Sequence, residues 1–302
     1  MIVTNDISKS YAGTPALAGI NFSVQKGELF GLIGPDGAGK STLFKILTTL
    51  LRPATGMARV AGFDTVKDYR SIRKIIGYMP GRFSLYQDLS VLENLTFFAT
   101  VFGTTMAANY HLIEEIYLQL EPFKNRRAGQ LSGGMKQKLA LCCALIHEPQ
   151  VLFLDEPTTG VDAVSRNEFW IMLKRLKAHG ITILVSTPYM DEANRCDRIA
   201  LMQEGRIMQI DTPENMVTSY RKSLLAVRTN HFYALIQDLR NNPTVERVEP
   251  FGEYLHLTSQ AEMDPQLIHD YLLARGHTAI EVKPVTASIE DVFLDLLEAT
   301  PG

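Results

Sequence analysis

The segment of residues 34–42, Gly-Pro-Asp-Gly-Ala-Gly-Lys-Ser-Thr, constrains the fold more than any other part of the sequence. It matches the pattern G-x-x-x-x-G-K-[ST], and it lies between a short apolar run at 29–33 and a helix-like stretch at 41–51. Glycines let backbone amides curl around a phosphate without Cβ clashes, and the N-terminus of the following helix adds partial positive charge. The motif therefore predicts a strand–loop–helix unit that binds phosphate, rather than a glycine turn without a ligand.

Two side chains of this loop carry its polar chemistry. Lys40 can reach the β and γ oxygens of a nucleotide, and the hydroxyl of Ser41 can ligate Mg²⁺. The residues assigned to nucleotide binding here are Gly34, Pro35, Asp36, Gly37, Ala38, Gly39, Lys40, Ser41 and Thr42.

A second run, Val-Leu-Phe-Leu at 151–154, ends in two carboxylates, Asp155 and Glu156. A continuous apolar run of this length is typical of a parallel strand buried on both faces. We expect Asp155 to hold Mg²⁺ through water and Glu156 to polarise the attacking water. Taken alone the two acids could also be turn residues, but the phosphate loop favours the catalytic interpretation.

The composition limits the class of protein. The chain has 302 residues, of which 46% are hydrophobic and 21% charged, as in globular domains, and no apolar run reaches the length of a membrane span. The first residues show no secretion signal, and three cysteines make no disulfide framework, so we expect a cytosolic protein. Residues 223–302 contain 5 Lys or Arg and 12 Asp or Glu, which argues against a basic tail for nucleic acid.

The pattern along the chain predicts two domains, 1–221 and 222–302. Over the first, strands and helices alternate, Ser90 and Glu93 have capping-box spacing before a helix to about residue 102, and Glu204-Gly205 predicts a hairpin turn. Over the second, the expected order is strand 224–228, helix 232–239, strands 245–248 and 254–257, helix 266–274, strand 279–282 and a last helix from Ser288. This order predicts a small α+β ferredoxin-like domain.

The segment Leu-Ser-Gly-Gly-Met-Lys-Gln at 131–137 precedes an apolar helix, and together with the two motifs above it resembles the signature sequence of ABC ATPases. The resemblance covers about residues 1–220 and implies an α/β P-loop NTPase fold with a helical arm at about 88–145. It implies that Tyr11 stacks on adenine and that Asp162 acts at a dimer interface. It also implies a head-to-tail dimer in which Ser132, Gly133 and Gly134 close on the nucleotide of the partner. An exposed turn tyrosine remains the alternative for Tyr11.

The sequence departs from the ABC pattern at four positions. Asp36 stands where Asn is commoner and Met135 where Gln is usual, and we expect little effect because backbone amides make the phosphate contacts. Gly81 occupies the place of the Q-loop glutamine, for which Gln87 is too distant to substitute, and Pro188 that of the switch histidine. We expect Thr187 to cap a helix that begins at Pro188. Because proline has neither a side-chain donor nor an N–H, we expect weak hydrolysis at this site.

The resemblance implies the ATP-binding component of an ABC exporter, located on the cytoplasmic face of the inner membrane, with ATP and Mg²⁺ as cofactors. Its expected partners are a second ATPase domain, identical or different and in a separate or the same polypeptide, and a membrane permease that docks near 82–89. The alternatives are a soluble ABC ATPase acting on ribosomes or DNA, and a regulatory binder without hydrolysis. The transported substrate does not follow from the sequence.

Overall fold

The computed structural model describes residues 1–299, and the chain divides into a first unit of Met1–Pro213 and a second that begins at Glu214. The sequence places the boundary after residue 221, so helix α7 (Pro213–Ser219) groups mostly with the second unit instead of the first. No helix among residues 1–299 is both long and apolar enough to cross a lipid bilayer.

A six-stranded sheet in the order β10-β9-β3-β8-β7-β6 forms the centre of the first unit. The strands from β9 to β6 run parallel, and β10 pairs antiparallel with β9 through the predicted hairpin at Glu204-Gly205. Every residue of β3, β7 and β8 is buried, as the continuous apolar runs predict. The strands are β3 (Leu29–Ile33), β6 (Ile76–Met79), β7 (Val151–Asp155), β8 (Thr182–Thr187), β9 (Arg198–Gln203) and β10 (Arg206–Asp211).

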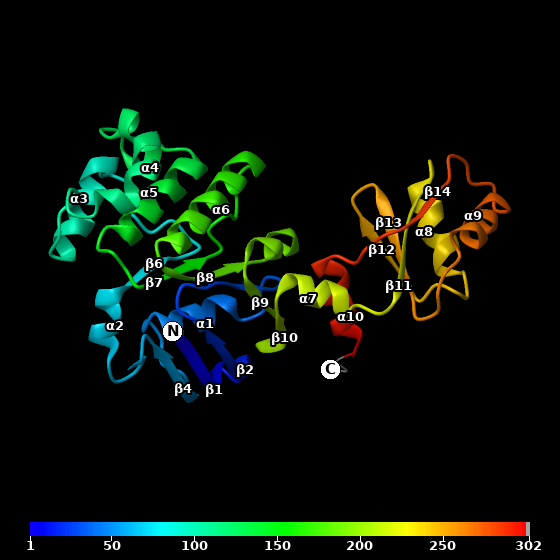
Figure 1. Ribbon diagram of the computed structural model, residues 1–302, viewed down its shortest axis with the longest axis horizontal. Coiled ribbons are helices and arrows are strands. Elements are labelled where there is room, and N and C mark those ends of the chain that lie inside the picture. Colours follow the sequence, from blue (N-terminus) through cyan, green and yellow to red (C-terminus); the bar gives the residue numbers. More distant parts are fainter. Residues whose placement is uncertain (300–302) are drawn as a thin grey trace. The chain divides into compact units, whose positions relative to one another are not determined.

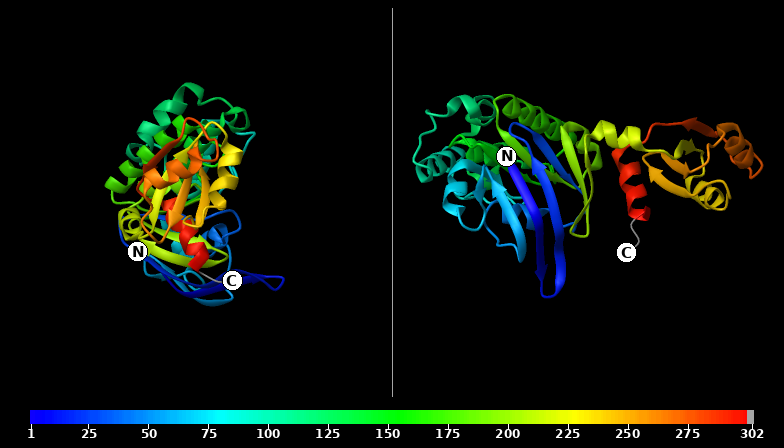
Figure 2. Two further views of the ribbon diagram at one scale, coloured as in Figure 1. Left: turned by 90° about the vertical axis from the view of Figure 1, so that its right-hand side faces the viewer. Right: turned by 60° about the horizontal axis from the view of Figure 1, so that its bottom comes forward.

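A second, antiparallel sheet in the order β2-β1-β4-β5 was not expected. Its strands are β1 (Ile2–Tyr11), β2 (Thr14–Val24), β4 (Thr55–Val60) and β5 (Phe63–Asp64), and β1 and β2 form the long blue hairpin of Figure 2. The predicted strand–helix alternation is therefore wrong for this part of the chain. The physical reason is that one face of the sheet packs on the core, so buried Ile2 and Thr4 alternate with exposed Val3.

Helices cover the central sheet and build the predicted helical arm. Figure 1 shows α3, α4 and α5 grouped together, away from β1, β2 and β4. The predicted capping box is confirmed, because Ser90 Oγ accepts from the Glu93 amide at 3.2 Å while Glu93 Oε2 accepts from the Ser90 amide at 2.7 Å. The helices of this unit are α1 (Lys40–Leu47), α2 (Tyr69–Ile75), α3 (Val91–Val101), α4 (Tyr110–Leu120), α5 (Gly133–Leu145) and α6 (Ala163–Ala178), with 3₁₀ turns η1 (Glu121–Phe123), η2 (Ala128–Gln130) and η3 (Met190–Arg195).

Packing between α1 and β7 positions the site. Phe44 of α1 meets Phe153 of β7 edge to face, with ring centroids 6.0 Å apart, inside the main hydrophobic core. Such an aromatic contact fixes the helix over the strand. The first turn of α1, which carries Lys40 and Ser41, therefore lies beside the carboxyl end of β7, where Asp155 and Glu156 follow.

The second unit has the strand and helix order that the sequence predicts, with an antiparallel sheet in the order β12-β13-β11-β14. Two of its strands begin later than expected, because Val245 lies in a turn closed by Asn242 and Ala279 has a left-handed φ of 50°. Leucines of α8 and α9 share one core cluster with β11 and β13, so both helices cover the same face. The elements are β11 (Ser223–Arg228), α8 (Phe232–Arg240), β12 (Arg247–Phe251), β13 (Tyr254–Ser259), α9 (Pro265–Leu273), β14 (Glu281–Pro284) and α10 (Ile289–Ala299).

Candidate functional site

The loop between β3 and α1 has a backbone that only glycine satisfies at several points. Gly37 and Gly39 have φ values of 83° and 98°, in the left-handed region that disfavours other residues. A Cβ on Gly34 would lie 2.1 Å from the carbonyl oxygen of Met202, and one on Gly39 would lie 2.4 Å from that of Ala16. The loop is therefore pressed against neighbouring backbone on its outer side, while the Gly34 amide donates to the carbonyl oxygen of Thr187 and the Ala38 amide to that of Pro35.

Lys40 lies at the centre of this loop with 3% of its surface exposed. Its Nζ donates to the carbonyl oxygens of Gly34 at 2.8 Å and Pro35 at 2.9 Å, and it lies 3.4 Å from Oε1 of Glu156. A buried ammonium needs such partners. The contacts hold the lysine across the mouth of the loop, where it can exchange a carbonyl for a phosphate oxygen.

The carboxylate of Asp155 joins the loop to the neighbouring strand. Its Oδ1 accepts from Ser41 Oγ at 3.2 Å and from Ser186 Oγ at 2.7 Å, and Asp155 is 4% exposed. Ser186 also accepts from the amide of Glu156 at 3.0 Å, and Glu156 itself has a left-handed φ of 50°. No sequence motif marks Ser186, which lies at the end of a buried strand, opposite Asp155 in the β7–β8 register.

Gly81 lies directly beside the two acids. A Cβ built on Gly81 would lie 3.1 Å from the carbonyl oxygen of Asp155 and 3.8 Å from Cβ of Glu156. A cavity of about 170 Å³ adjoins this point, with Gly81, Gln137 and Glu156 among its lining residues. Position 81 thus faces the acid pair without offering a side chain to it.

Pro188 follows the last residue of β8 and is half-buried. The predicted helix start is wrong, because η3 begins only at Met190 and is capped by Tyr189. The physical reason is that Thr187 stays in the strand: its hydroxyl accepts from the Tyr189 amide at 3.1 Å and donates to the buried carboxylate of Glu192. Proline therefore links the strand to the turn.

The Ser132–Gly134 turn and Asp162 both cap helices, and they lie close to each other. Ser132 is exposed and its Oγ accepts from the Met135 amide at 3.4 Å, and a Cβ on Gly134 would lie 3.0 Å from Ser165 Oγ. Asp162 accepts from the amides of Val164 and Ser165 at 3.1 and 3.0 Å, and these bonds, that from Ser165 first, lower its pKa.

Tyr11 ends β1 and is 46% exposed, with Lys9 Nζ 6.0 Å from its ring centroid. An exposed ring beside an ammonium leaves one aromatic face open to solvent. Stacking of Tyr11 on adenine stays a prediction.

Comparison with known proteins decides the family. Residues 17–159 match the ABC transporter family. The chain is 39% identical over 303 residues to the probable multidrug ABC transporter ATP-binding protein YbhF of Escherichia coli, covering 98% of this chain and 52% of that protein. It is 36% identical over 294 residues to the Nod factor export ATP-binding protein I of Rhizobium sp. (strain N33), covering 96% and 94%. The chain belongs to the ABC transporter ATP-binding proteins.

Solved structures agree with this assignment. A dimeric ATP-binding cassette in a post-hydrolysis state with ADP and phosphate matches with a TM-score of 0.64 and 26% identity, covering 70% of this chain and 98% of that one. The protein cbiO1 of Clostridium perfringens, part of the ABC transporter complex cbiONQ, matches with a TM-score of 0.64 and 28% identity, covering 72% of this chain and 90% of that one. The predicted P-loop NTPase fold of an ABC ATPase is confirmed.

The names of the relatives favour transport over the ribosome- or DNA-directed alternative, since they describe export and multidrug transporter components. The chain spans about half the length of the first curated relatives that it matches, those of Escherichia coli and Shigella flexneri.

Proposed function

We propose that this ABC ATPase binds Mg-ATP at the Lys40 loop and couples the nucleotide to a separate membrane permease of an exporter. The observation that carries the proposal is the convergence of four side chains at one glycine loop. Lys40 lies 3.4 Å from Glu156, and Ser41 lies 3.2 Å from Asp155. An ammonium, a hydroxyl and two carboxylates at a helix N-terminus form the donor set for a nucleoside triphosphate with a divalent cation.

The residues present fit Mg²⁺ as a cation shared with the nucleotide. Among residues 1–299, no group of three or more His, Cys, Asp or Glu side chains could hold a metal by itself. Mg²⁺ usually keeps several waters and takes one or two protein oxygens plus phosphate oxygens, so Ser41 and Asp155 suffice. When bound, the ion neutralises the charge of the β and γ phosphates.

The catalytic part of the proposal assigns a step to Glu156. The carboxylate of Glu156 lies beside Lys40, and Ser186 accepts a hydrogen bond from the Glu156 amide. We propose that this carboxylate accepts a hydrogen bond from the O–H of the attacking water. Gly81 and Pro188 add no side-chain donor around that water. Because removing one transition-state donor typically costs about 10²–10³ in rate, we propose slow turnover at this site.

The test of the site compares binding with turnover in the purified, monodisperse chain. We expect ATP to bind in the presence of Mg²⁺, with hydrolysis far slower than one per second. Failure to bind ATP would refute the site itself. Steady hydrolysis at several per second, lost in Glu156→Gln, would refute only the claim of slow turnover.

A second ATPase domain is the proposed nucleotide partner. The Ser132–Gly134 turn is exposed at the N-terminus of α5, where it can face the phosphates of another copy. The Escherichia coli relative is about twice as long as the region it shares with this chain, which supports a partner that is a different domain. A transport-active complex that contains only two identical copies of this chain would count against an unequal pair.

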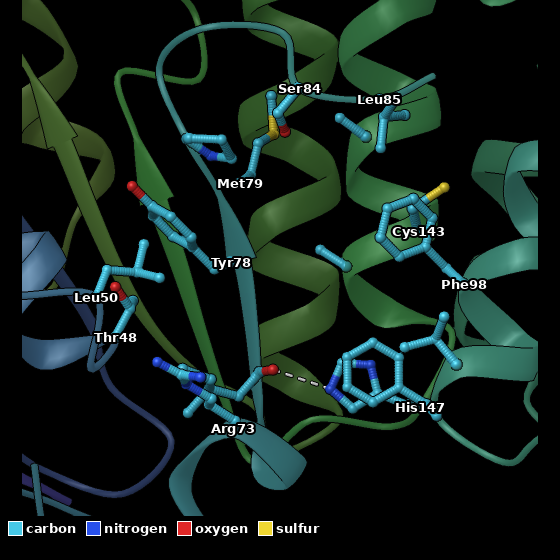
Figure 3. Close-up of a pocket in the computed structure, with 16 residues that line it drawn as sticks. Thr48, Leu50, Arg73, Tyr78, Met79, Ser84, Leu85, Phe98, Cys143 and His147 are labelled. Carbon is cyan, nitrogen blue, oxygen red and sulfur yellow. Dashed lines mark hydrogen bonds between the residues drawn. The ribbon is translucent and has the colours of Figure 1, made fainter. Parts of the chain in front are cut away.

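An apolar cavity of about 440 Å³ between β6, α3 and α5 is the proposed docking site of the permease (Figure 3). Leu85, Phe98 and Cys143 are among its lining residues, and it adjoins the 82–89 loop. A short helix of the permease suits this apolar lining. Tyr78 also lines the cavity, and burial, assisted by the charge of Asp155, raises its pKa, so the cavity lies within electrostatic reach of the nucleotide site.

Phe98→Asp tests the docking site, because a carboxylate in the cavity would oppose an apolar helix. We expect it to abolish co-purification with the permease and to leave ATP affinity unchanged. Leu118→Asp on α4, where Leu118 is exposed and outside the cavity, is the matched control. Equal association of the two variants would exclude this surface. Through this contact with the permease, the chain would lie on the cytoplasmic face of the inner membrane.

A further inference from the structure

Glu192 is a buried carboxylate behind the nucleotide site, with 3% of its surface exposed. Its Oε2 accepts from Thr187 Oγ1 at 2.5 Å and from Thr158 Oγ1 at 3.1 Å. Its Oε1 accepts from Nε of Arg166 at 3.1 Å. Three donors from three different segments thus converge on one charge, and charge-assisted hydrogen bonds of this kind are about twice as strong as neutral ones.

Two of these donors belong to segments that flank the reacting groups. Thr158 follows Glu156 by two residues and is 1% exposed. Thr187 is fully buried, and its carbonyl oxygen accepts from the amide of Gly34, the first residue of the phosphate loop, at 3.3 Å. The carboxylate therefore joins the segment after Glu156 to the strand end that supports the loop.

The third donor extends this connection to α6. The amide of Arg166 donates to the carbonyl oxygen of Asp162 at 2.9 Å, in the first turn of the helix that Asp162 caps. Its guanidinium also lies 4.3 Å from the ring of Tyr189 and donates to Asp191 at 3.1 Å. Glu192 thus ties the start of α6 to the segment on both sides of Pro188.

We propose that Glu192 is a positioning residue of the ATP site. It fixes Glu156 and Asp162 relative to the phosphate loop, because Pro188 has no side chain that could form hydrogen bonds to hold them. The inference rests on the proposed ATP-binding function. Without the carboxylate, the hydroxyls of Thr158 and Thr187 would lose a buried acceptor, which destabilises the arrangement of both segments. Glu156 has a left-handed backbone, a conformation that persists only when its surroundings enforce it.

The chain offers a matched control in Glu28. This glutamate is 7% exposed, and its carboxylate accepts from Arg198 Nη1 at 3.2 Å and from the Gln25 amide at 2.6 Å. It precedes β3, at the end of the strand opposite to the phosphate loop. Glu28→Gln therefore disrupts a similar buried ion pair without touching the nucleotide site.

The experiment compares Glu192→Gln with Glu28→Gln in the full chain with Mg-ATP. It measures melting temperature, ATP affinity, single-turnover hydrolysis with protein in excess, and amide hydrogen exchange of residues 158–161 in the ATP-bound state. Both variants are expected to melt at lower temperature. Glu192→Gln should hydrolyse at least about tenfold more slowly with ATP affinity within about twofold, and exchange faster at Thr159 and Val161. Glu28→Gln should match the wild type in rate and exchange.

Equal rates and exchange in the two variants, or an equal slowing of both, would overturn the proposal. If the wild-type rate is below detection, the exchange of these amides decides, and unchanged protection in Glu192→Gln refutes the role. If Glu192→Gln does not fold, Arg166→Lys keeps the charge but removes the planar fork, and it should slow hydrolysis about threefold. A wild-type chain that binds no ATP would refute the ATP site and, with it, the positioning role of Glu192.

Discussion

The part of the site that holds phosphate and the part that would direct water differ in how many side chains they supply. In the first, Lys40 makes two hydrogen bonds within the loop, and Ser41 meets Asp155. In the second, Glu156 lies beside Gly81, and Pro188 follows the neighbouring strand β8, but neither Gly81 nor Pro188 has a polar side chain. The two tasks use different side chains, so binding and hydrolysis can weaken independently.

Lys40→Ala should produce the largest effect, because it removes the buried ammonium from the phosphate-holding part. We expect ATP affinity to fall about 100-fold, equivalent to ~2.7 kcal/mol, as measured by equilibrium titration with Mg²⁺. Lys45→Ala, at an exposed position of the same helix, is the control and should bind normally. Similar affinity of the two variants would mean that the loop does not bind the triphosphate through Lys40.

Pro188→His combined with Gly81→Gln should restore side chains to the part of the site that would direct water, and so raise ATP turnover. Two side-chain donors return to the reacting part, so we expect turnover to rise about 10- to 100-fold with ATP affinity within about threefold. Steady-state hydrolysis measures the gain, and Glu156→Gln in the same background should abolish it. No gain in a reconstituted complex would show that another step limits the rate.

The two single variants should contribute unequally. A Cβ at position 81 would lie 3.1 Å from the carbonyl oxygen of Asp155, so Gly81→Gln requires the segment of Asp155 and Glu156 to shift. We therefore expect Pro188→His alone to raise turnover several-fold and Gly81→Gln alone to raise it less. A larger gain from Gly81→Gln would show that the backbone at Asp155 adjusts freely.

Much of the fold follows from the sequence where one signal dominates. The continuous apolar runs of β7 and β8 predict buried parallel strands, and the Ser90–Glu93 spacing predicts the start of α3. The antiparallel sheet of β1 and β2 escapes prediction because the irregular pairing between Thr4 and Ser10 interrupts the alternation of buried and exposed residues.

Some residues of the site could likewise be predicted from the sequence, and others could not. The Lys40 loop and the acid pair are each continuous in sequence and each follow a parallel strand, so their proximity can be predicted from the topology of the sheet alone. Ser186 and Glu192 could not be predicted, because their partners lie 31 and 34 residues away and depend on the register of β7 and β8 and on the turn after Pro188. A polar residue that acts through tertiary contacts leaves no local pattern.

Tyr11→Ala should give the smallest effect, at the edge of the phosphate-holding part. Stacking of a base on an aromatic ring contributes about 1–3 kcal/mol, and because Tyr11 is 46% exposed we expect the low end, a fivefold loss of ATP affinity. Tripolyphosphate, which has no base, should bind the wild type and Tyr11→Ala equally, while Tyr11→Phe should retain ATP affinity because it keeps the ring. Equal losses for ATP and tripolyphosphate would assign the tyrosine to the structure of the β1–β2 turn and would leave the adenine without an aromatic contact from this residue.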